Sequence, residues 1–167
     1  MKIPALLLIA CLVVVGWADQ PGFTEDEVAD IYIAALNGEV RQDPPRDAAL
    51  NRNLMTDAGH YSVAGRMPDR VVERLRAQGL FSEVCGEGPD RGAGPRCISQ
   101  HARGELRMSR PIPRGADSAD VYIGGGSLRP VNDTASVFIH MGGTIRCRIV
   151  REGGRWVRRA CEQTMIV

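Results

Sequence analysis

The C-terminal third of the chain, residues 119–167, is built from short apolar segments that are separated by glycines. Two of them, Ala119–Ile123 and Ala135–Met141, each run into consecutive glycines, where we expect a strand to end. Short segments rich in β-branched and aromatic residues, bounded by glycine turns, are typical of β-hairpins. This stretch therefore predicts a sheet of antiparallel strands that follow one another in the sequence.

The last predicted hairpin spans residues 144–167. Its first strand alternates: Ile145, Cys147 and Ile149 are expected on one face, and Arg146, Arg148 and Val150 on the other. A turn at Glu152-Gly-Gly154 leads into the partner strand, since glycine adopts positive φ without strain.

Six arginines between residues 146 and 159 are expected on the solvent face of this hairpin. The arginine fork matches carboxylate and phosphate groups, so Arg146, Arg148 and Arg158 are candidate binding residues. The alternative is a solvated face whose arginines pair with the acidic segment at residues 19–57.

Residues 1–18 have the organisation of a secretory signal peptide. Lys2 precedes an apolar run, and Gly16-Trp17-Ala18 is a small-residue cleavage site. The uncharged run is shorter than the roughly 18 to 20 residues of a membrane-spanning helix. Lipid attachment at Cys11 is the alternative, although the apolar run continues beyond this cysteine. We therefore expect an exported protein, periplasmic or extracellular, with no membrane span after processing and a single domain over residues 19–167.

The overall charge indicates which partners are not expected. Lys2 is the only lysine, so the processed chain carries as many arginines as acidic residues and has no net charge. A neutral chain lacks the basic excess of nucleic-acid-binding proteins, and no such partner is predicted.

The processed chain retains four of the five cysteines, namely Cys85, Cys97, Cys147 and Cys161. An even number in an exported chain indicates two disulfides. Three pairings are open, and we favour Cys85–Cys97 and Cys147–Cys161 because each pair brackets a local turn. No two cysteines have the spacing of a zinc site, so no metal is predicted.

The second pairing depends on the register of the last hairpin. A two-residue turn at Gly153-Gly154 places Cys147 opposite Ala160, with the two thiols on opposite faces. A three-residue loop over Gly153–Arg155 places Cys147 opposite Cys161. We therefore expect the longer loop if the disulfide forms.

Two helices are predicted in the N-terminal half. Thr24 and Glu27 form a capping box that starts the first helix, which is expected to end at Asn37-Gly38 or one turn further, at about Arg41. The second helix runs from Pro68 to Gly79, because proline suits the first turn and glycine the end.

Three further segments have modest strand character: Ala48–Met55, Leu80–Cys85 and Gly104–Arg110. We therefore predict an α+β fold in which the two helices pack on one face of an antiparallel sheet of about four to five strands.

Four local patterns, in this order, resemble small exported bacterial proteins of unknown function. The patterns are Ile31-Tyr-x-Ala-Ala35, Pro68-x-x-Val-x-x-x-Leu75, Leu106-x-x-Ser-x-x-x-Pro113 and Arg148-x-x-x-Glu-Gly-Gly-Arg-Trp156. The last hairpin is also similar to the sheets of cystatin-like and nuclear-transport-factor-like domains. The resemblance implies an α+β shape, and its residues are packing and turn residues that imply no catalytic group.

The remaining motifs do not support a reaction. His60, His101 and His140 lack metal-binding spacing, and Gly124–Ser127 lacks the lysine of a phosphate-binding loop. No catalytic residue and no cofactor is predicted. We expect a binding or interaction module whose partner is an envelope protein or a small anionic ligand. The alternatives are a small enzyme with a site of dispersed residues in a sheet cavity, and a structural component of the cell envelope.

We predict that the exported protein is cleaved between Ala18 and Asp19, because a small residue precedes this bond. Intact-mass analysis of the protein recovered after export will show a chain that begins at Asp19. A retained leader, or a mass increase from lipid on Cys11, would contradict the prediction.

Overall fold

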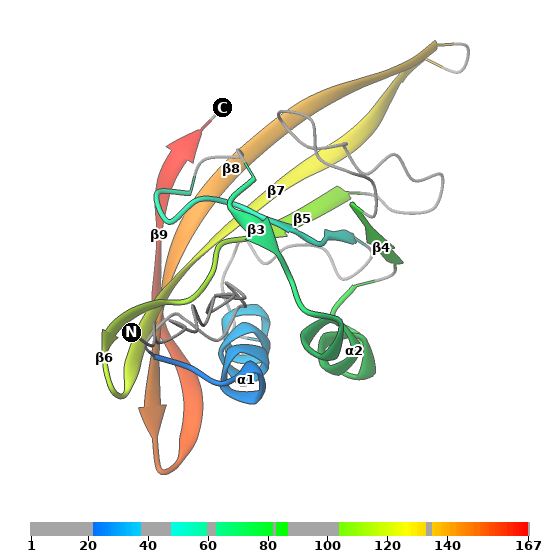
Figure 1. Cartoon of the computed structure of the whole chain (residues 1–167). Coiled ribbons are helices and arrows are strands. Elements are labelled where there is room, and N and C mark those ends of the chain that lie inside the picture. The colour runs from blue at the N-terminus through cyan, green and yellow to red at the C-terminus, as the bar shows by residue number, and fades with distance from the viewer. Residues whose placement is uncertain are drawn as a thin grey trace, which may run out of the picture.

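The computed structural model describes residues 22–37, 48–59, 63–81, 83–86, 104–132 and 135–166 (Figure 1). For residues 126–132, 135–142 and 165–166 only the backbone is described. The helices are α1 (Glu25–Leu36) and α2 (Asp69–Ala77). The strands are β1 (Ala49–Asn51), β2 (Asn53–Leu54), β3 (Gly65–Arg66), β4 (Glu83–Cys85), β5 (Gly104–Met108), β6 (Ile112–Gly115), β7 (Ser118–Asn132), β8 (Ala135–Glu152) and β9 (Arg155–Ile166).

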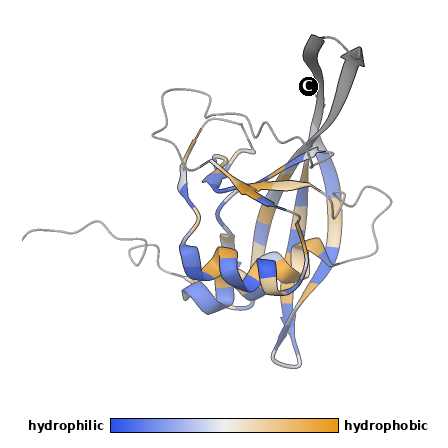
Figure 2. Ribbon diagram, turned by 90° about the vertical axis from the view of Figure 1, so that its right-hand side faces the viewer, coloured by the Kyte–Doolittle hydropathy of each residue, from blue (hydrophilic) through white to orange (hydrophobic). Residues whose placement is uncertain are grey.

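The described strands form one large mixed sheet and one small sheet. The large sheet has seven strands in the order β4-β1-β5-β7-β8-β9, with β6 beside β7. The small sheet is the antiparallel pair β2–β3. Both helices lie on one face of the large sheet, and hydrophobic residues gather where the two layers meet (Figures 1 and 2).

The chain is α+β, but the predicted antiparallel sheet of four to five strands is wrong. Strand β1 runs parallel to both of its neighbours, with Ala49 paired to Glu83 of β4 and to Glu105 of β5. Parallel neighbours need a crossover connection, and α2 lies in the connection between β1 and β4. Strands of three residues are too short to show an alternating pattern, so the sequence did not reveal this parallel part.

The predicted start of α1 is confirmed. The Thr24 hydroxyl accepts a hydrogen bond from the Glu27 backbone N–H at 3.3 Å, and the Thr24 N–H donates to the Glu27 carboxylate at 3.0 Å. The backbone N–H of Thr24 and the guanidinium of Arg151 together lower the pKa of Glu27. The helix ends at the predicted place, with Asn37 as its C-cap.

The core lies between the helices and the sheet. The apolar residues of α1 that face the sheet are buried, and so are the inward residues of three strands: Leu106, Met108, Val121, Ile123, Cys147 and Ile149. The hydroxyl of buried Tyr32 donates a 2.9 Å hydrogen bond to the backbone oxygen of Ser109, which ties α1 to the end of β5. Burial raises the pKa of Tyr32 far above its ordinary value, so this hydroxyl keeps its proton.

The glycine runs that were expected to end strands lie inside β7 and β8. Gly125 pairs with Gly143, and Gly126 pairs with Gly142. Beyond the reach of β5 and β9, the two strands continue as a paired ribbon as far as Asn132 and Ala135 (Figure 1). The glycines therefore continue the ladder rather than stopping it.

The β8–β9 hairpin contains the predicted Cys147–Cys161 disulfide, which is confirmed. The predicted three-residue loop is wrong. The turn is Gly153-Gly154, whose φ angles are 55° and 79°, as a two-residue hairpin turn requires.

A β-bulge reconciles the short turn with the disulfide. Ile149 pairs with Arg158, whereas Arg148 pairs with Ala160, so Arg159 is an extra residue in β9. This extra residue shifts the register by one position and places Cys161 opposite Cys147.

Several predictions from the sequence concern residues outside the described part of the chain. They include the leader with Cys11, and Cys97. Cys85 is disulfide-bonded, but its pairing with Cys97 stays a prediction. No helix in the described part of the chain combines the length and the apolar character that a membrane crossing requires.

We predict that Thr24→Ala lowers the free energy of unfolding by about 1 kcal/mol, because the mutation leaves the Glu27 N–H without its capping partner. Thr24→Ser, which keeps the hydroxyl, is the matched control and should retain most of the stability. Chemical denaturation measures both variants. An unchanged midpoint for the alanine variant would show that the capping box does not stabilise α1.

Candidate anion-binding site

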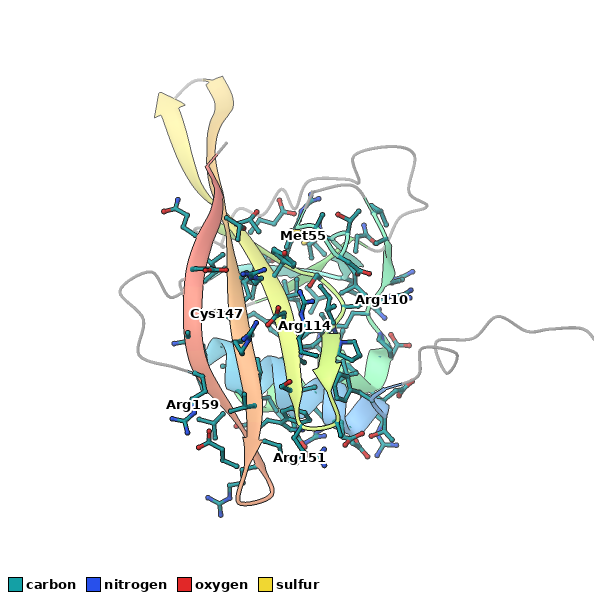
Figure 3. The ribbon with its side chains drawn as sticks, turned by 90° about the vertical axis from the view of Figure 1, so that its left-hand side faces the viewer. Met55, Arg110, Arg114, Cys147, Arg151 and Arg159 are labelled. Carbon is teal, nitrogen blue, oxygen red and sulfur yellow. A yellow bond between two sulfur atoms is a disulfide. The ribbon has the colours of Figure 1, made fainter. Side chains whose placement is uncertain are left out.

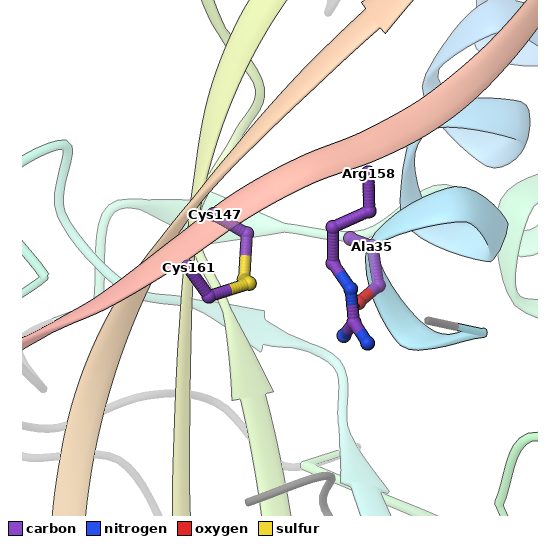
Figure 4. The surroundings of a disulfide bond; sticks show 4 residues. All are labelled: Ala35, Cys147, Arg158 and Cys161. Atoms are coloured by element: carbon purple, nitrogen blue, oxygen red, sulfur yellow. A yellow bond between two sulfur atoms is a disulfide. The ribbon is translucent and has the colours of Figure 1, made fainter. Parts of the chain in front are cut away.

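The three arginines selected from the sequence lie on different faces of the sheet. Arg146 and Arg148 project from β8 on the face opposite the helices, which we call the outer face. Arg158 of β9 is turned to the helix side and donates a 2.8 Å hydrogen bond to the backbone oxygen of Ala35 (Figure 4). A guanidinium is favourable at the C-terminal end of α1, where carbonyl groups lack helical partners. The structure therefore brings Arg146 and Arg148 together and separates Arg158 from them.

The expected single basic face does not form. Arg151 pairs with Glu27 of α1, and its guanidinium lies 4.7 Å from the centre of the Trp156 ring. Arg159 pairs with Glu152 across the hairpin. The Arg151–Glu27 pair agrees with the alternative interpretation, in which arginines of this hairpin pair with the acidic N-terminal segment.

A buried carboxylate on the outer face holds two arginines. Asp120 of β7 lies opposite Arg148 of β8, and its side chain is only 1% exposed. One carboxylate oxygen accepts a hydrogen bond from Nε of Arg148 at 3.1 Å. The other accepts one from Nε of Arg114 at 2.8 Å. Each guanidinium is thus fixed through Nε on the same carboxylate.

Arg114 reaches this carboxylate because of a bulge in β6. Pro113 pairs with Ala119 and Gly115 pairs with Ser118, so Arg114 is an extra residue between them. A bulge redirects a side chain relative to the regular pleat. Arg114 lies over β7 on the outer face, beside the strands of the last hairpin (Figure 3).

The charges of this group do not cancel. Burial alone would raise the pKa of Asp120, but the hydrogen bonds from Arg148 and Arg114 outweigh it and lower the pKa below the ordinary value. Asp120 is therefore ionised at neutral pH, and one negative charge faces two positive charges. The side chains of Arg114 and Arg148 are 46% and 55% exposed, so the excess positive charge is open to solvent.

A pocket of about 240 Å³ adjoins Arg148 on the outer face. Its lining consists of Asp120, Arg146, Arg148, Ala160, Cys161 and Glu162. Ala160 lies opposite Arg148 in the β8–β9 ladder, and its methyl group leaves room beside the longer arginine. The Glu162 carboxylate pairs with Arg146 and raises the pKa of that arginine. Arg146 is thus neutralised by its neighbour, whereas Arg148 shares the single charge of Asp120 with Arg114.

The chemistry of this pocket suits binding of an anion. Guanidinium groups donate hydrogen bonds to carboxylate and phosphate oxygens. The lining contains no histidine, and Cys161 is held in a disulfide, so it presents no nucleophile with a neighbouring base. Among the described residues, no group of three histidine, cysteine, aspartate or glutamate side chains is placed to hold a metal ion.

A second polar cluster is buried between β1 and β5. The side-chain amide of Asn51 donates a 2.7 Å hydrogen bond to Glu105, and Nε of Arg107 donates to the same oxygen. Both charged side chains are almost fully buried. A buried ion pair needs such additional hydrogen bonds to offset its desolvation. We therefore assign this cluster to the pairing of the parallel strands.

The sequence analysis missed Asp120 and Arg114. Asp120 carried one signal, since it is an acidic residue within the apolar segment Ala119–Ile123, and a buried charge requires a partner. Arg114 carried none, because it lies in a segment that the sequence analysis did not assign to the sheet and reaches Asp120 only through the bulge in β6.

No protein-family model matches this chain, and no curated protein or solved structure matches it either. The resemblance to cystatin-like and nuclear-transport-factor-like domains therefore stays a prediction. The candidate site is therefore inferred from the geometry of its own residues alone.

We predict that Arg148→Gln and Arg114→Gln each raise the pKa of Asp120, because each removes a charged hydrogen bond and leaves the carboxylate buried. Carboxyl carbon shifts followed by NMR across an acidic pH range will measure the change. Arg159→Gln, which removes an arginine that pairs with Glu152, is the control and should leave the pKa of Asp120 unchanged. Equal pKa values in all three variants would contradict the assignment.

Proposed function

We propose that this chain is an exported binding module that holds an anionic ligand at the outer ends of Arg114 and Arg148. One observation carries the proposal: the buried carboxylate of Asp120 engages Nε of both arginines, while both side chains remain about half exposed. The terminal amino groups of the two guanidiniums are the donors that a carboxylate or phosphate ligand would use.

Fixing the arginines in advance favours binding. A free arginine side chain loses rotamer entropy when it orders around a ligand. Here Asp120 already orders both side chains, so that part of the entropic cost is met in the folded protein. The adjoining pocket provides space for the rest of a small ligand next to Arg148.

The location of this activity is part of the proposal. The Cys147–Cys161 disulfide suits an oxidising compartment, where such bonds persist. The leader-like residues 1–18 agree with export to the periplasm or the extracellular space. The ligand would then be an anion of the cell envelope or of the surrounding medium.

We predict that the processed chain binds inorganic phosphate or acetate at this site, and that the affinity falls as salt concentration rises. In a titration followed by NMR, the signals of the Nε–H groups of Arg114 and Arg148 should shift. Arg148→Gln should weaken binding at least tenfold, because the mutation removes one of the two positive charges.

The matched control is Arg159→Gln, which removes an equally exposed arginine from the same hairpin. It should bind the anion as the wild type does. Equal affinity in the two variants, or shifts centred on other arginines, would refute the proposed site.

A further inference from the structure

Strand β9 is the edge of the large sheet on the side of the candidate site. It is the last strand in the order β4-β1-β5-β7-β8-β9, so no described strand pairs with its other side. An edge strand exposes backbone N–H and C=O groups that are able to pair with another extended chain.

The register identifies which backbone groups point to the free edge. The Cα atoms of Cys147 and Cys161 are 4.0 Å apart, the close spacing of a non-hydrogen-bonded antiparallel pair. In such a pair the N–H and C=O groups point away from the partner strand. The backbone N–H and C=O groups of Cys161 therefore point to the free edge. Gln163 lies two residues later and pairs with Ile145 without a shift in register, so its backbone groups point the same way.

Two bulges limit the regular part of this edge. Arg159 is the extra residue on one side, and Thr164 is the extra residue on the other, because Ile145 pairs with Gln163 and Thr144 pairs with Met165. Bulges at sheet edges hinder pairing with other chains. Regular pairing with a further strand is thus confined to Ala160–Gln163, and three of these four residues line the pocket.

The charges beside this short edge select the partner. Arg148 is half exposed and lies opposite Ala160, whose small side chain forms part of the pocket lining on the edge strand. A strand added to β9 would lie about 4.8 Å from β9 and about twice as far from β8. Arg148 of β8 is held by Asp120 of β7, so a long acidic side chain on the outer face of the added strand, level with Ala160, has to extend across the Ala160 methyl group to enter the pocket beside Arg148. Glu162 lies two residues further on the same face and would repel a second acidic residue opposite it.

We infer that Ala160–Gln163 of β9 binds an extended acidic peptide segment as an additional strand, with one carboxylate side chain of the segment in the pocket beside Arg148. This inference rests on the proposed function, because it assigns the anion of that site to the side chain of a protein ligand. Main-chain hydrogen bonds to Cys161 and Gln163 supply affinity, and the pocket supplies specificity.

The test uses the processed chain and three capped pentapeptides of alternating β-branched residues. The first has a single central glutamate, the second has glutamine in its place, and the third keeps the glutamate but has methylated backbone nitrogens. We expect the first peptide to bind at least tenfold more tightly than either of the others in calorimetry. We also expect it to shift the amide signals of Cys161 and Gln163.

Four variants of the protein separate the contributions. Ala160→Leu fills the pocket without changing charge and should weaken binding of the first peptide, as Arg148→Gln should. Glu162→Gln should strengthen binding of a peptide that carries a second glutamate two residues from the first. Arg159→Gln should bind the first peptide as the wild type does, since its side chain pairs with Glu152.

The outcomes separate this inference from the proposed function. If phosphate or acetate binds at Arg148 while the methylated and unmethylated peptides bind equally, strand addition is refuted and the anion site stands. If neither the small anions nor the peptides bind, both proposals fail. Pairing of β9 with a second copy of the chain, detected as a dimer that the first peptide does not dissociate, would also overturn the inference.

Discussion

The alternation of side chains along β8 is the constraint on which the rest of the structure depends. Cys147 and Ile149 point toward the helices and enter the core, so Arg146 and Arg148 must point the other way. In a strand in the middle of a sheet, each side chain points to one face or to the other. The packing of α1 and α2 on one face therefore determines which face carries the charged residues of the candidate site.

Two bulges adapt this regular scheme to the site. The extra residue in β6 directs Arg114 to the carboxylate that Arg148 already contacts. The extra residue in β9, Arg159, brings Cys161 opposite Cys147. The first bulge thus changes the partner of one arginine and the second changes the register of one disulfide, while the neighbouring ladder stays paired.

The buried charges have two different roles in this sheet. The Glu105–Arg107 pair is almost fully buried and completes its hydrogen bonds with Asn51 of the neighbouring parallel strand. Asp120 is equally buried, yet both of its arginine partners extend into solvent. A fully buried ion pair stabilises the pairing of the strands. A buried carboxylate whose arginine partners are exposed leaves guanidinium N–H groups free to bind a ligand. This difference is the physical reason for placing the site at Asp120.

The sequence by itself determined the features that depend on neighbouring residues. The cap of α1 at Thr24 and the alternating faces of β8 follow from local spacing, and the structure contains both. The disulfide between Cys147 and Cys161 was expected because the two residues bracket a local turn, but the bulge at Arg159 sets its register. Only the tertiary structure decided the parallel pairing of β1, the bulge at Arg159 and the meeting of Arg114 with Asp120. These features join segments that are distant in the sequence or depend on one extra residue in a ladder. Local periodicity predicts neither the contacts between distant segments nor the position of an extra residue, because the packing of the whole sheet sets the free energy of both.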